Sequence, residues 1–356
     1  MPPLFLSHPG REQESRGFSP WALLTFALLL PTLLHAQRKP RNPDDRSGHD
    51  RADRATILHV ANVYVTGDAG APPITTITPG HEFVISSRNG PWLNIFIDTD
   101  SPEDDDPDSK PEFTDPATQS NVPSSGWIRD KGVVGPSTPN GDALIFGYAA
   151  QLEAAAAEPH PPQDAAAQSH LLYARVADYF PDSPLTPEAL FRSADIRWQL
   201  NKADIATLPS THEGDGMLRP QIYEGALKRV MKYFPNSPFA ARAAFDLIDN
   251  KLCGDWQGLP NCPEKETQLY LNYANSYRTG PKSAEALYDA AYRQGVLVTM
   301  YLVDDNPKLS AAAAKSCKSI ADQLQHDYPT SDYASRAASI AFRVSQGIPV
   351  YGTDRD

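Results

Sequence analysis

The chain has 356 residues, a formal net charge of −12 at pH 7 and a sequence pI near 5.2. At roughly 150 residues per domain, this length predicts two or three domains and argues against a single compact core. No Lys/Arg stretch is dense enough to neutralise a run of phosphates, so nucleic acid is excluded as an expected partner. The 34 prolines gather in a few segments, which predicts linkers between folded regions.

Residues 1–36 have the pattern of a secretory signal peptide. Arg11 and Arg16 precede an apolar run from Trp21 to Leu34, and Ala36 supplies a small residue at the cleavage point. The alternative is a retained membrane anchor, but the run contains a proline and is shorter than the roughly 20 apolar residues of a membrane span. No cysteine follows it for lipid attachment. We expect a periplasmic or secreted protein that is neither a lipoprotein nor membrane-spanning after cleavage.

Residues 37–54 are polar and charged without apolar periodicity, which predicts a flexible linker. From residue 55 to 135, short apolar runs with period two alternate with turns rich in Gly and Pro. The runs ILHVANVYV, ITTI, EFVISS, WLNIFI and GWI predict five short strands of a small β-barrel. An acidic insert at 98–125 lacks the glycine of a calcium loop. It is expected to be a solvated loop whose like charges repel, with calcium binding as the alternative.

Several short motifs in residues 55–135 carry a family resemblance. They are Val63-Tyr64-Val65, Pro79-Gly80 followed by Phe83-Val84-Ile85, Gly90-Pro91-Trp92-Leu93 with Ile95, and Gly126-Trp127-Ile128. Together they resemble the bacterial SH3 family, although that family usually has a tight turn where the acidic insert stands. The resemblance implies docking on a cell-wall or envelope component. Trp92 and Trp127 are candidates for stacking on sugars, while core packing is the commoner role of such residues in a small barrel.

Residues 136–163 are expected to hold a linker and a first helix, which begins at about Asp142. Residues 164–347 then repeat one motif, and residues 348–356 form a tail. A degenerate fourth copy covers Tyr277 to Ser283. The three clear copies are Tyr179-Phe180-Pro181-Asp182-Ser183-Pro184, Tyr233-Phe234-Pro235-Asn236-Ser237-Pro238 and Asp327-Tyr328-Pro329-Thr330-Ser331-Asp332, each followed by an alanine, Ala189, Ala243 or Ala337.

Each copy contains the residue types that end one helix and begin another. The proline cannot continue the preceding helix and moves its predecessor out of the α region. The serine or aspartate that follows is expected to cap the next helix, and the alanine lets the two helix axes approach closely. We therefore expect these corners to be structural, with the aromatics packed in the core. The residues concerned are Tyr179, Pro181, Tyr233, Pro235, Tyr328 and Pro329.

The corners resemble those of tetratricopeptide-repeat proteins of the bacterial envelope, of the type that acts beside outer-membrane assembly and Tol-Pal machinery. The resemblance implies an all-α solenoid of helical hairpins that binds protein partners. The corners lie farther apart than the roughly 34 residues of the simple repeat, so inserts at 206–218 and 253–262 are expected to project as loops. Arginines expected on solvent-facing sides are candidate contacts: Arg192, Arg229, Arg242 and Arg336.

The cysteines fit an oxidising compartment. Cys253 and Cys262 bracket the loop GDWQGLPN, whose Gly and Pro residues let the chain fold back, so a disulfide between them is one expected outcome. Eight intervening residues and the lack of a spaced His partner argue against zinc. Cys317 is left over in an Ala-rich helical stretch, where a small buried side chain is its simplest role.

The sequence offers no candidate for catalysis, a cofactor or a metal site. It contains no Gly-x-Ser-x-Gly elbow and no phosphate-binding glycine loop, and His59 and His81 are the histidines of the barrel. His212-Glu213 lacks the second His of a zinc-protease helix. The expected fold is therefore multidomain α+β, an SH3-like β-barrel followed by a tetratricopeptide-like solenoid.

The leading functional hypothesis is an exported, non-catalytic scaffold whose repeats bind a protein and whose barrel docks on the envelope. One alternative makes the barrel a peptidoglycan-binding module with the repeats as a spacer. Another is an enzyme that acts through a metal held by the acidic insert. Architecture alone is weak support for any of them.

Overall fold

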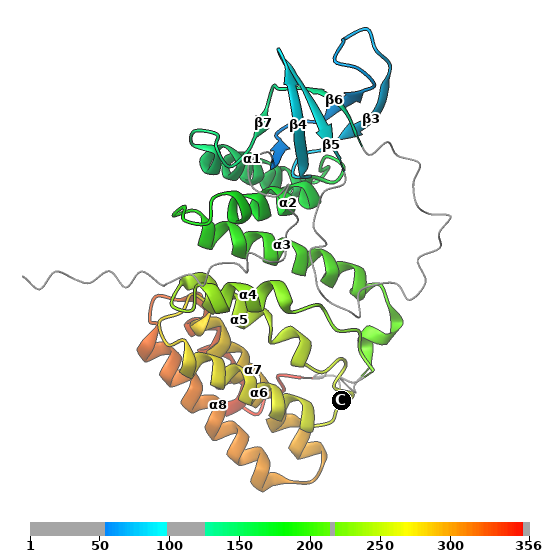
Figure 1. Cartoon of the computed structure of the whole chain (residues 1–356). Coiled ribbons are helices and arrows are strands. Elements are labelled where there is room, and N and C mark those ends of the chain that lie inside the picture. The colour runs from blue at the N-terminus through cyan, green and yellow to red at the C-terminus, as the bar shows by residue number, and fades with distance from the viewer. Residues whose placement is uncertain (1–53, 98–124, 214–217, 352–356) are drawn as a thin grey trace, which may run out of the picture. The chain divides into compact units, whose positions relative to one another are not determined.

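A computed structural model describes residues 54–97, 125–213 and 218–351, and it shows a mixed α+β protein (Figure 1). Strands occupy the region up to residue 134, and helices begin at residue 141. All described residues belong to one compact unit, Pro43–Asp356. The expected signal peptide and flexible linker fall almost entirely outside the described residues, as do the acidic insert and the end of the tail.

The strands form one antiparallel sheet in the order β3-β2-β6-β5-β4-β1-β7. Their bounds are β1 Arg54–Ile57, β2 Ala61–Tyr64, β3 Pro73–Ile77, β4 Phe83–Asn89, β5 Trp92–Phe96, β6 Ser125–Arg129 and β7 Val133–Val134. The expectation of five strands was wrong at two places. The run expected to start at Ile57 is broken between β1 and β2, and the Leu58 N–H donates to the Gly132 carbonyl, which extends the pairing of β1 with β7. Residues 133–134 add a short strand that pairs with β1.

Alternation along the strands separates two faces of the sheet. Leu93 and Ile128 are opposite each other in register and are both fully buried. They belong to an apolar cluster on one face that contains Ala55, Ile57, Val63, Ile77, Phe83, Ile85, Leu93, Ile95, Ile97 and Ile128. Trp92 and Phe96 alternate with these residues along β5. The sheet therefore has a core on one side and aromatic side chains on the other.

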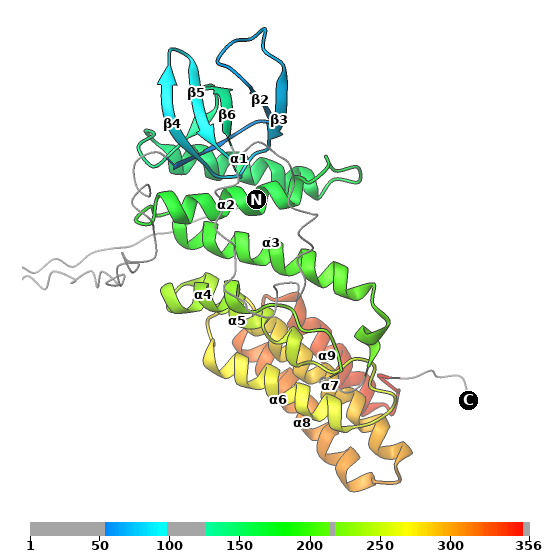
Figure 2. The same ribbon diagram turned by 45° about the vertical axis from the view of Figure 1, so that its right-hand side comes forward.

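The rest of the described chain is helical. The α-helices are α1 Gly141–Ala156, α2 Ala165–Tyr179, α3 Thr186–Ala206, α4 Gly225–Tyr233, α5 Pro238–Asp246, α6 Asn261–Ser276, α7 Ser283–Val303, α8 Pro307–Asp327 and α9 Asp332–Ser345, with short 3₁₀ turns η4 Pro209–His212 and η5 Asp249–Lys251. Four consecutive pairs form hairpins: α2 with α3, α4 with α5, α6 with α7, and α8 with α9. Figures 1 and 2 show the second hairpin between α3 and the later helices.

Residues 136–163 do more than link two domains. Ile145 and Ala149 of α1 are fully buried in a cluster with Leu172 and Val176 of α2. Val134 of the sheet belongs to the same cluster, and Leu58 packs against it. The sheet and the first helices therefore share an apolar core.

A buried polar contact, called here the sheet–helix junction, joins the residues before β4 to α2. Arg175 Nε donates to the Gly80 carbonyl at 2.9 Å, and Arg175 Nη1 lies 4.0 Å from Glu82 Oε1. Arg54 Nη1 pairs with the same carboxylate. Gly80 has φ +88°, and a Cβ built there would stand 2.5 Å from the Leu171 Cβ. Only glycine fits both this backbone conformation and this close approach.

Candidate functional site

The repeated corners have one backbone geometry. Each first helix of a hairpin ends at a half-buried aromatic residue, with φ between −124° and −136° and ψ between 49° and 58°. These terminal residues are Phe180, Phe234, Tyr277 and Tyr328. In every case the N–H of the residue three positions later donates to the carbonyl of the aromatic. The corner prolines are exposed, so they act on the backbone conformation and not through packing.

Serine caps the second helix at two of the corners. Ser237 Oγ accepts from the Ala240 N–H at 3.1 Å, and Ser331 Oγ accepts from the Tyr333 N–H at 3.3 Å. The expectation of a cap was wrong at the first corner, where α3 begins after Leu185 with no side-chain cap. There the Ser183 hydroxyl donates to Asp142 at the start of α1, at 2.6 Å. The Ser183 hydroxyl therefore binds a preceding helix, while its oxygen accepts from the Leu185 N–H just before α3 at 3.2 Å.

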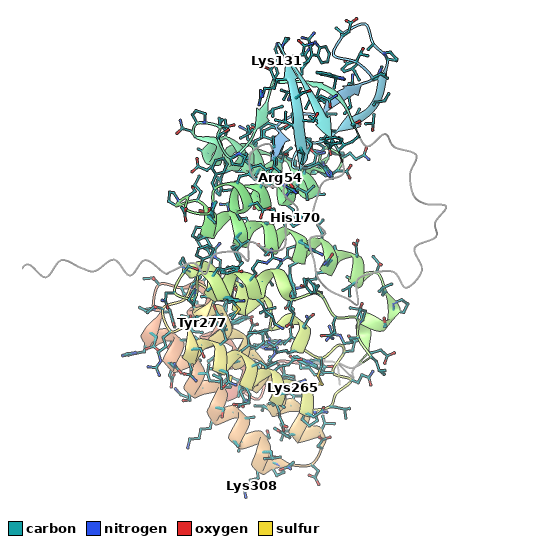
Figure 3. All side chains as sticks on the ribbon, in the orientation of Figure 1. Arg54, Lys131, His170, Lys265, Tyr277 and Lys308 are labelled. Atoms are coloured by element: carbon teal, nitrogen blue, oxygen red, sulfur yellow. A yellow bond between two sulfur atoms is a disulfide. The ribbon has the colours of Figure 1, made fainter. Side chains whose placement is uncertain are left out.

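The fourth corner can be aligned with the others on its aromatic residue, Tyr277 (labelled in Figure 3), although Arg278 stands where they have the first proline. Gly280 takes the place of the corner serine, and Pro281 matches the second proline of the first two corners. Ala286 then occupies the position of Ala189, Ala243 and Ala337, and all four alanines are fully buried. The sequence missed this alanine because alignment on Pro281 displaces it. The small side chain at this position permits close approach of the two helices of each hairpin.

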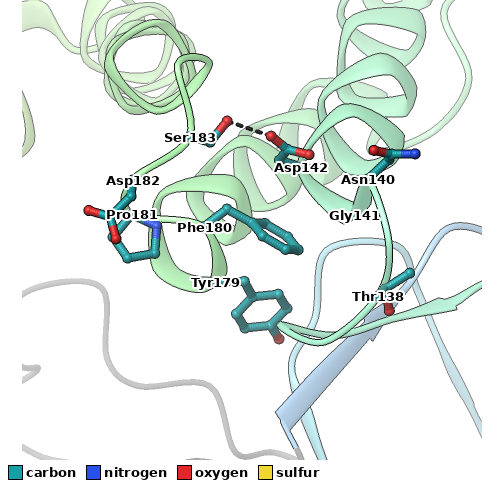
Figure 4. Close-up of a pocket in the computed structure, with 9 residues that line it drawn as sticks. All are labelled: Thr138, Asn140, Gly141, Asp142, Tyr179, Phe180, Pro181, Asp182 and Ser183. Atoms are coloured by element: carbon teal, nitrogen blue, oxygen red, sulfur yellow. Dashed lines mark hydrogen bonds between the residues drawn. The ribbon is translucent and has the colours of Figure 1, made fainter.

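A shallow pocket of about 400 Å³ opens at the first corner (Figure 4). Its lining contains the two carboxylates Asp142 and Asp182, and none of its residues is a His, Cys, Lys or Arg. The hydrogen bond from Ser183, with one from a backbone N–H of α1, holds the pKa of Asp142 below its usual value. The pocket therefore offers contacts but no acid–base pair. It is lined by Thr138, Asn140, Gly141, Asp142, Tyr179, Phe180, Pro181, Asp182 and Ser183.

The corner tyrosines expected in the core differ in burial. Tyr179 is 8% exposed, and this burial, with the nearby Glu82 charge, raises the pKa of its hydroxyl well above the usual value. Tyr233 is 40% exposed beside Lys232 on the outer side of α4. Tyr328 is half-buried, and its hydroxyl donates to the Arg278 carbonyl. Core packing therefore holds for Tyr179 and is wrong for Tyr233.

The two barrel tryptophans lie on the sheet face opposite the core. Trp92 is only 6% exposed, because Tyr64 packs edge-on against it and the Arg129 guanidinium lies 4.0 Å from its ring centroid. Trp127 is half-buried on the adjacent strand. Neighbouring Phe96 remains 48% exposed. A sugar would reach the Trp92 ring only after Arg129 moved away.

The four nominated arginines have different surroundings. Arg192 is held by Glu153 and Glu188, with nitrogen–oxygen distances of 2.7 and 2.6 Å. Arg336 pairs with Asp332 along α9. The remaining two, Arg229 on α4 and Arg242 on α5, are exposed on the second hairpin. Arg336 is exposed as well, so the second hairpin holds two of the three exposed arginines of the nominated set.

The structure joins Cys253 and Cys262 in a disulfide, with sulfur atoms 2.10 Å apart. Glu266 of α6 is 1% exposed and accepts hydrogen bonds from the Cys253 N–H at 2.9 Å and from Trp256 Nε1 at 3.2 Å. The expectation that the 253–262 insert simply projects was wrong, because this buried carboxylate anchors it. Arg219 donates to the Thr211 and Leu252 carbonyls. Arg219 thereby connects η4, in the insert at 206–218, to the chain just before Cys253.

Acidic side chains gather where the second hairpin meets its neighbours, at a place called here the acidic joint. It comprises Asp195 of α3, Asp246 of α5, Asp249 of η5, and Glu285 and Asp289 of α7, all half-buried. Burial, with the charges of Asp195 and Asp249, raises the pKa of Asp246 to about 7. Burial also raises the pKa of Asp289 to about 6. This group could not be recognised in the sequence, because its members come from separate helices.

One serine–histidine contact occurs between α2 and α3, at the labelled His170 (Figure 3). His170 Nδ1 lies 3.0 Å from Ser193 Oγ and 2.8 Å from the Ser193 carbonyl oxygen. A carbonyl only accepts, so Nδ1 must carry the proton and cannot act as the base for Ser193. Within residues 54–97, 125–213 and 218–351, no group of three or more His, Cys, Asp or Glu side chains is arranged to hold a metal.

The helices of the described segments are all too short or too polar to cross a membrane. No family model matches the chain, and no curated protein matches it. Among solved structures it is similar to a de novo designed helical repeat protein, with 16% sequence identity, a TM-score of 0.22, and coverage of 58% of this chain and 94% of that one. A TM-score of this size carries no argument about fold or function.

Proposed function

We propose that the chain is an exported, non-catalytic scaffold that binds a protein partner through its helical hairpins. The observation that supports this most is the set of four equivalent corners, each with the same backbone turn and a fully buried alanine. Stacked hairpins of this kind bury one side against their neighbours and leave extended helix faces for a partner. In this proposal the hairpins are tetratricopeptide-like and the curled sheet is SH3-like, docking on a wall or envelope component.

The second hairpin is the proposed contact surface. Lys228, Arg229 and Lys232 are exposed on α4, and Arg242 is exposed on α5. Glu224 offsets one of these four charges by pairing with Lys228. The surface of this hairpin remains basic, in a chain whose net charge is −12. An acidic protein surface has the complementary charge.

The test uses the full-length chain, because the sheet and first helices share a core. The immobilised protein is incubated with envelope extract beside a Lys228→Glu, Arg229→Glu, Lys232→Glu variant. The matched control is Lys308→Glu, Lys315→Glu, Lys318→Glu, at three exposed lysines of α8. We expect the wild type and control to retain the same partner and the α4 variant to retain at least tenfold less. Failure to retain a partner, or equal retention by both variants, would contradict the proposal.

Export is tested separately by N-terminal sequencing of the protein recovered from the periplasm or medium. Cleavage before Gln37 is the expected result, and an intact N-terminus in the membrane fraction would contradict it. The peptidoglycan-binding alternative has less support, because Trp92 is covered by Arg129. Co-sedimentation of the full chain with purified sacculi, lost in Trp127→Ala, would favour that alternative.

A further inference from the structure

The contact between the second and third hairpins is apolar at its centre. Phe245 of α5 packs on Tyr270 and Tyr273 of α6, with ring centroids 6.0 and 5.2 Å apart. Ile248 follows α5 and is 5% exposed in the cluster with these tyrosines and with Leu287 of α7. The acidic joint lies beside this contact, since Asp246 is adjacent to Phe245 in α5.

The cations near the joint each pair most closely with a carboxylate other than Asp246. Arg293 binds Glu266 most closely, and its distance to Asp289 is longer, at 3.5 Å. Asp195 accepts from an amide, that of Gln199. The closest ion pairs are Lys202 with Asp249 at 2.6 Å, Lys282 with Glu285 at 2.7 Å, and Arg293 with Glu266 at 2.7 Å.

Among the described side chains, no cation forms an ion pair with Asp246. The charges acting on it come from each packed element: Asp195 and Lys202 on α3, Asp249 on η5, and Lys282 at the start of α7. Tyr273 of α6 also faces it. Lys202 and Lys282 attract its carboxylate, but they are neutralised by their own partners. Ionisation of Asp246 therefore adds a half-buried negative charge to a contact that already has an excess of them.

We infer that the contact between the second and third hairpins is a pH-sensitive joint, which is closed when Asp246 binds a proton and loosened when Asp246 is ionised. The inference is independent of the identity of the partner. It concerns the hairpin proposed to carry the contact surface, so loosening would change how that hairpin is held on α6 and α7.

The sign follows from the two states of the chain. In the unfolded chain Asp246 has its ordinary pKa near 3.8, and in the folded protein the value rises to about 7. The folded state therefore keeps a proton that the unfolded state releases. The stabilisation is fully present below about pH 4 and is lost as the pH rises through about 7. Asp289 contributes in the same direction, with its pKa near 6.

Thermal unfolding between pH 5 and 9 tests the inference, with Asp246→Asn as an uncharged imitation of the protonated side chain. Asp322→Asn is the matched control, because Asp322 is an exposed helical aspartate of α8. We expect the wild-type and control midpoints to fall as the pH rises from 5 towards 7 and to level off by about pH 8. The Asp246→Asn midpoint should change much less and should exceed the wild-type midpoint at pH 8.

A second variant keeps the test decisive if Asp246→Asn fails to fold. Asp195→Asn removes one neighbouring charge, so the wild-type fall should persist with its midpoint moved to lower pH. An unchanged midpoint in this variant, or an Asp246→Asn profile that falls as steeply as the wild type, would overturn the inference. So would a wild-type profile without any fall between pH 5 and 7.

Discussion

The sheet–helix junction and the acidic joint both bring charged side chains between distant elements, and they differ in how the charges are matched. At the junction, Glu82 is 5% exposed and is faced by the guanidinium groups of Arg54 and Arg175. At the joint, Asp246 faces other carboxylates and cations that already have partners. The amount of buried charge therefore does not decide whether a contact is firm or sensitive to pH. Pairing makes the first contact firm, and its absence makes the second sensitive to protons.

The largest expected effect comes from breaking the matched contact. Glu82→Gln removes the buried charge that faces Arg54 and Arg175, and removal of one partner from a buried ion pair costs about 3–5 kcal/mol of unfolding free energy. Guanidinium denaturation measures this loss. The control is Asp322→Asn, which breaks an exposed pair on α8 and should cost less than about 1 kcal/mol. Similar small losses in both variants would show that the junction is not held by its charges.

The next largest loss of stability is expected where Gly80 closely approaches α2 at the same junction. Gly80→Ala adds a Cβ that would stand 2.5 Å from the Leu171 Cβ. The expected loss is about 2–4 kcal/mol, which combines the left-handed backbone penalty with overpacking. Gly90→Ala separates the two causes, because Gly90 also has positive φ but nothing lies within 4 Å of its Cβ. That control should lose about 1 kcal/mol, and an equal loss at both glycines would remove the steric part of the argument.

Reduction of the disulfide probes the region beside the joint. The bond closes a loop with a sequence separation of 9, so its loss should lower the unfolding free energy by about 2–3 kcal/mol. Denaturation with and without reductant measures the difference. Burial raises the pKa of the remaining thiol, Cys317, to about 11, so the oxidised native protein should show no fast-reacting thiol. A thiol that reacts rapidly before reduction would contradict this arrangement.

The smallest effect is expected at the second corner, where a serine caps α5. Ser237→Ala removes the cap that accepts from the Ala240 N–H and should cost about 1 kcal/mol. Ser319→Ala on the exposed side of α8 is the control, where alanine suits the helix at least as well. Equal stability of the two variants would show that the corner serine does not stabilise its helix.

The corners could be predicted from the sequence because their physics is local. Proline, serine and alanine at fixed offsets determine where one helix ends and the next begins. Three clear copies and a degenerate fourth could therefore be recognised in the sequence. The junction was not predictable in this way, since Arg175 and Gly80 are 95 residues apart. The joint needs three helices to be placed before Asp195, Asp246 and Asp289 come together. The strand break after Ile57 was also missed, because the short β1 pairs with β4 and β7, which are distant from it in the sequence.

Hydrogen exchange of the intact, oxidised chain tests the contrast between the two contacts most directly. Protection factors, corrected for intrinsic exchange, are compared at pH 6 and pH 8 for peptides from β4 and α2 and for peptides from α5, α6 and α7. We predict unchanged protection at the sheet–helix junction and reduced protection at the acidic joint at pH 8, with Asp246→Asn restoring the latter. Equal changes in both regions, or none at the joint, would contradict the account.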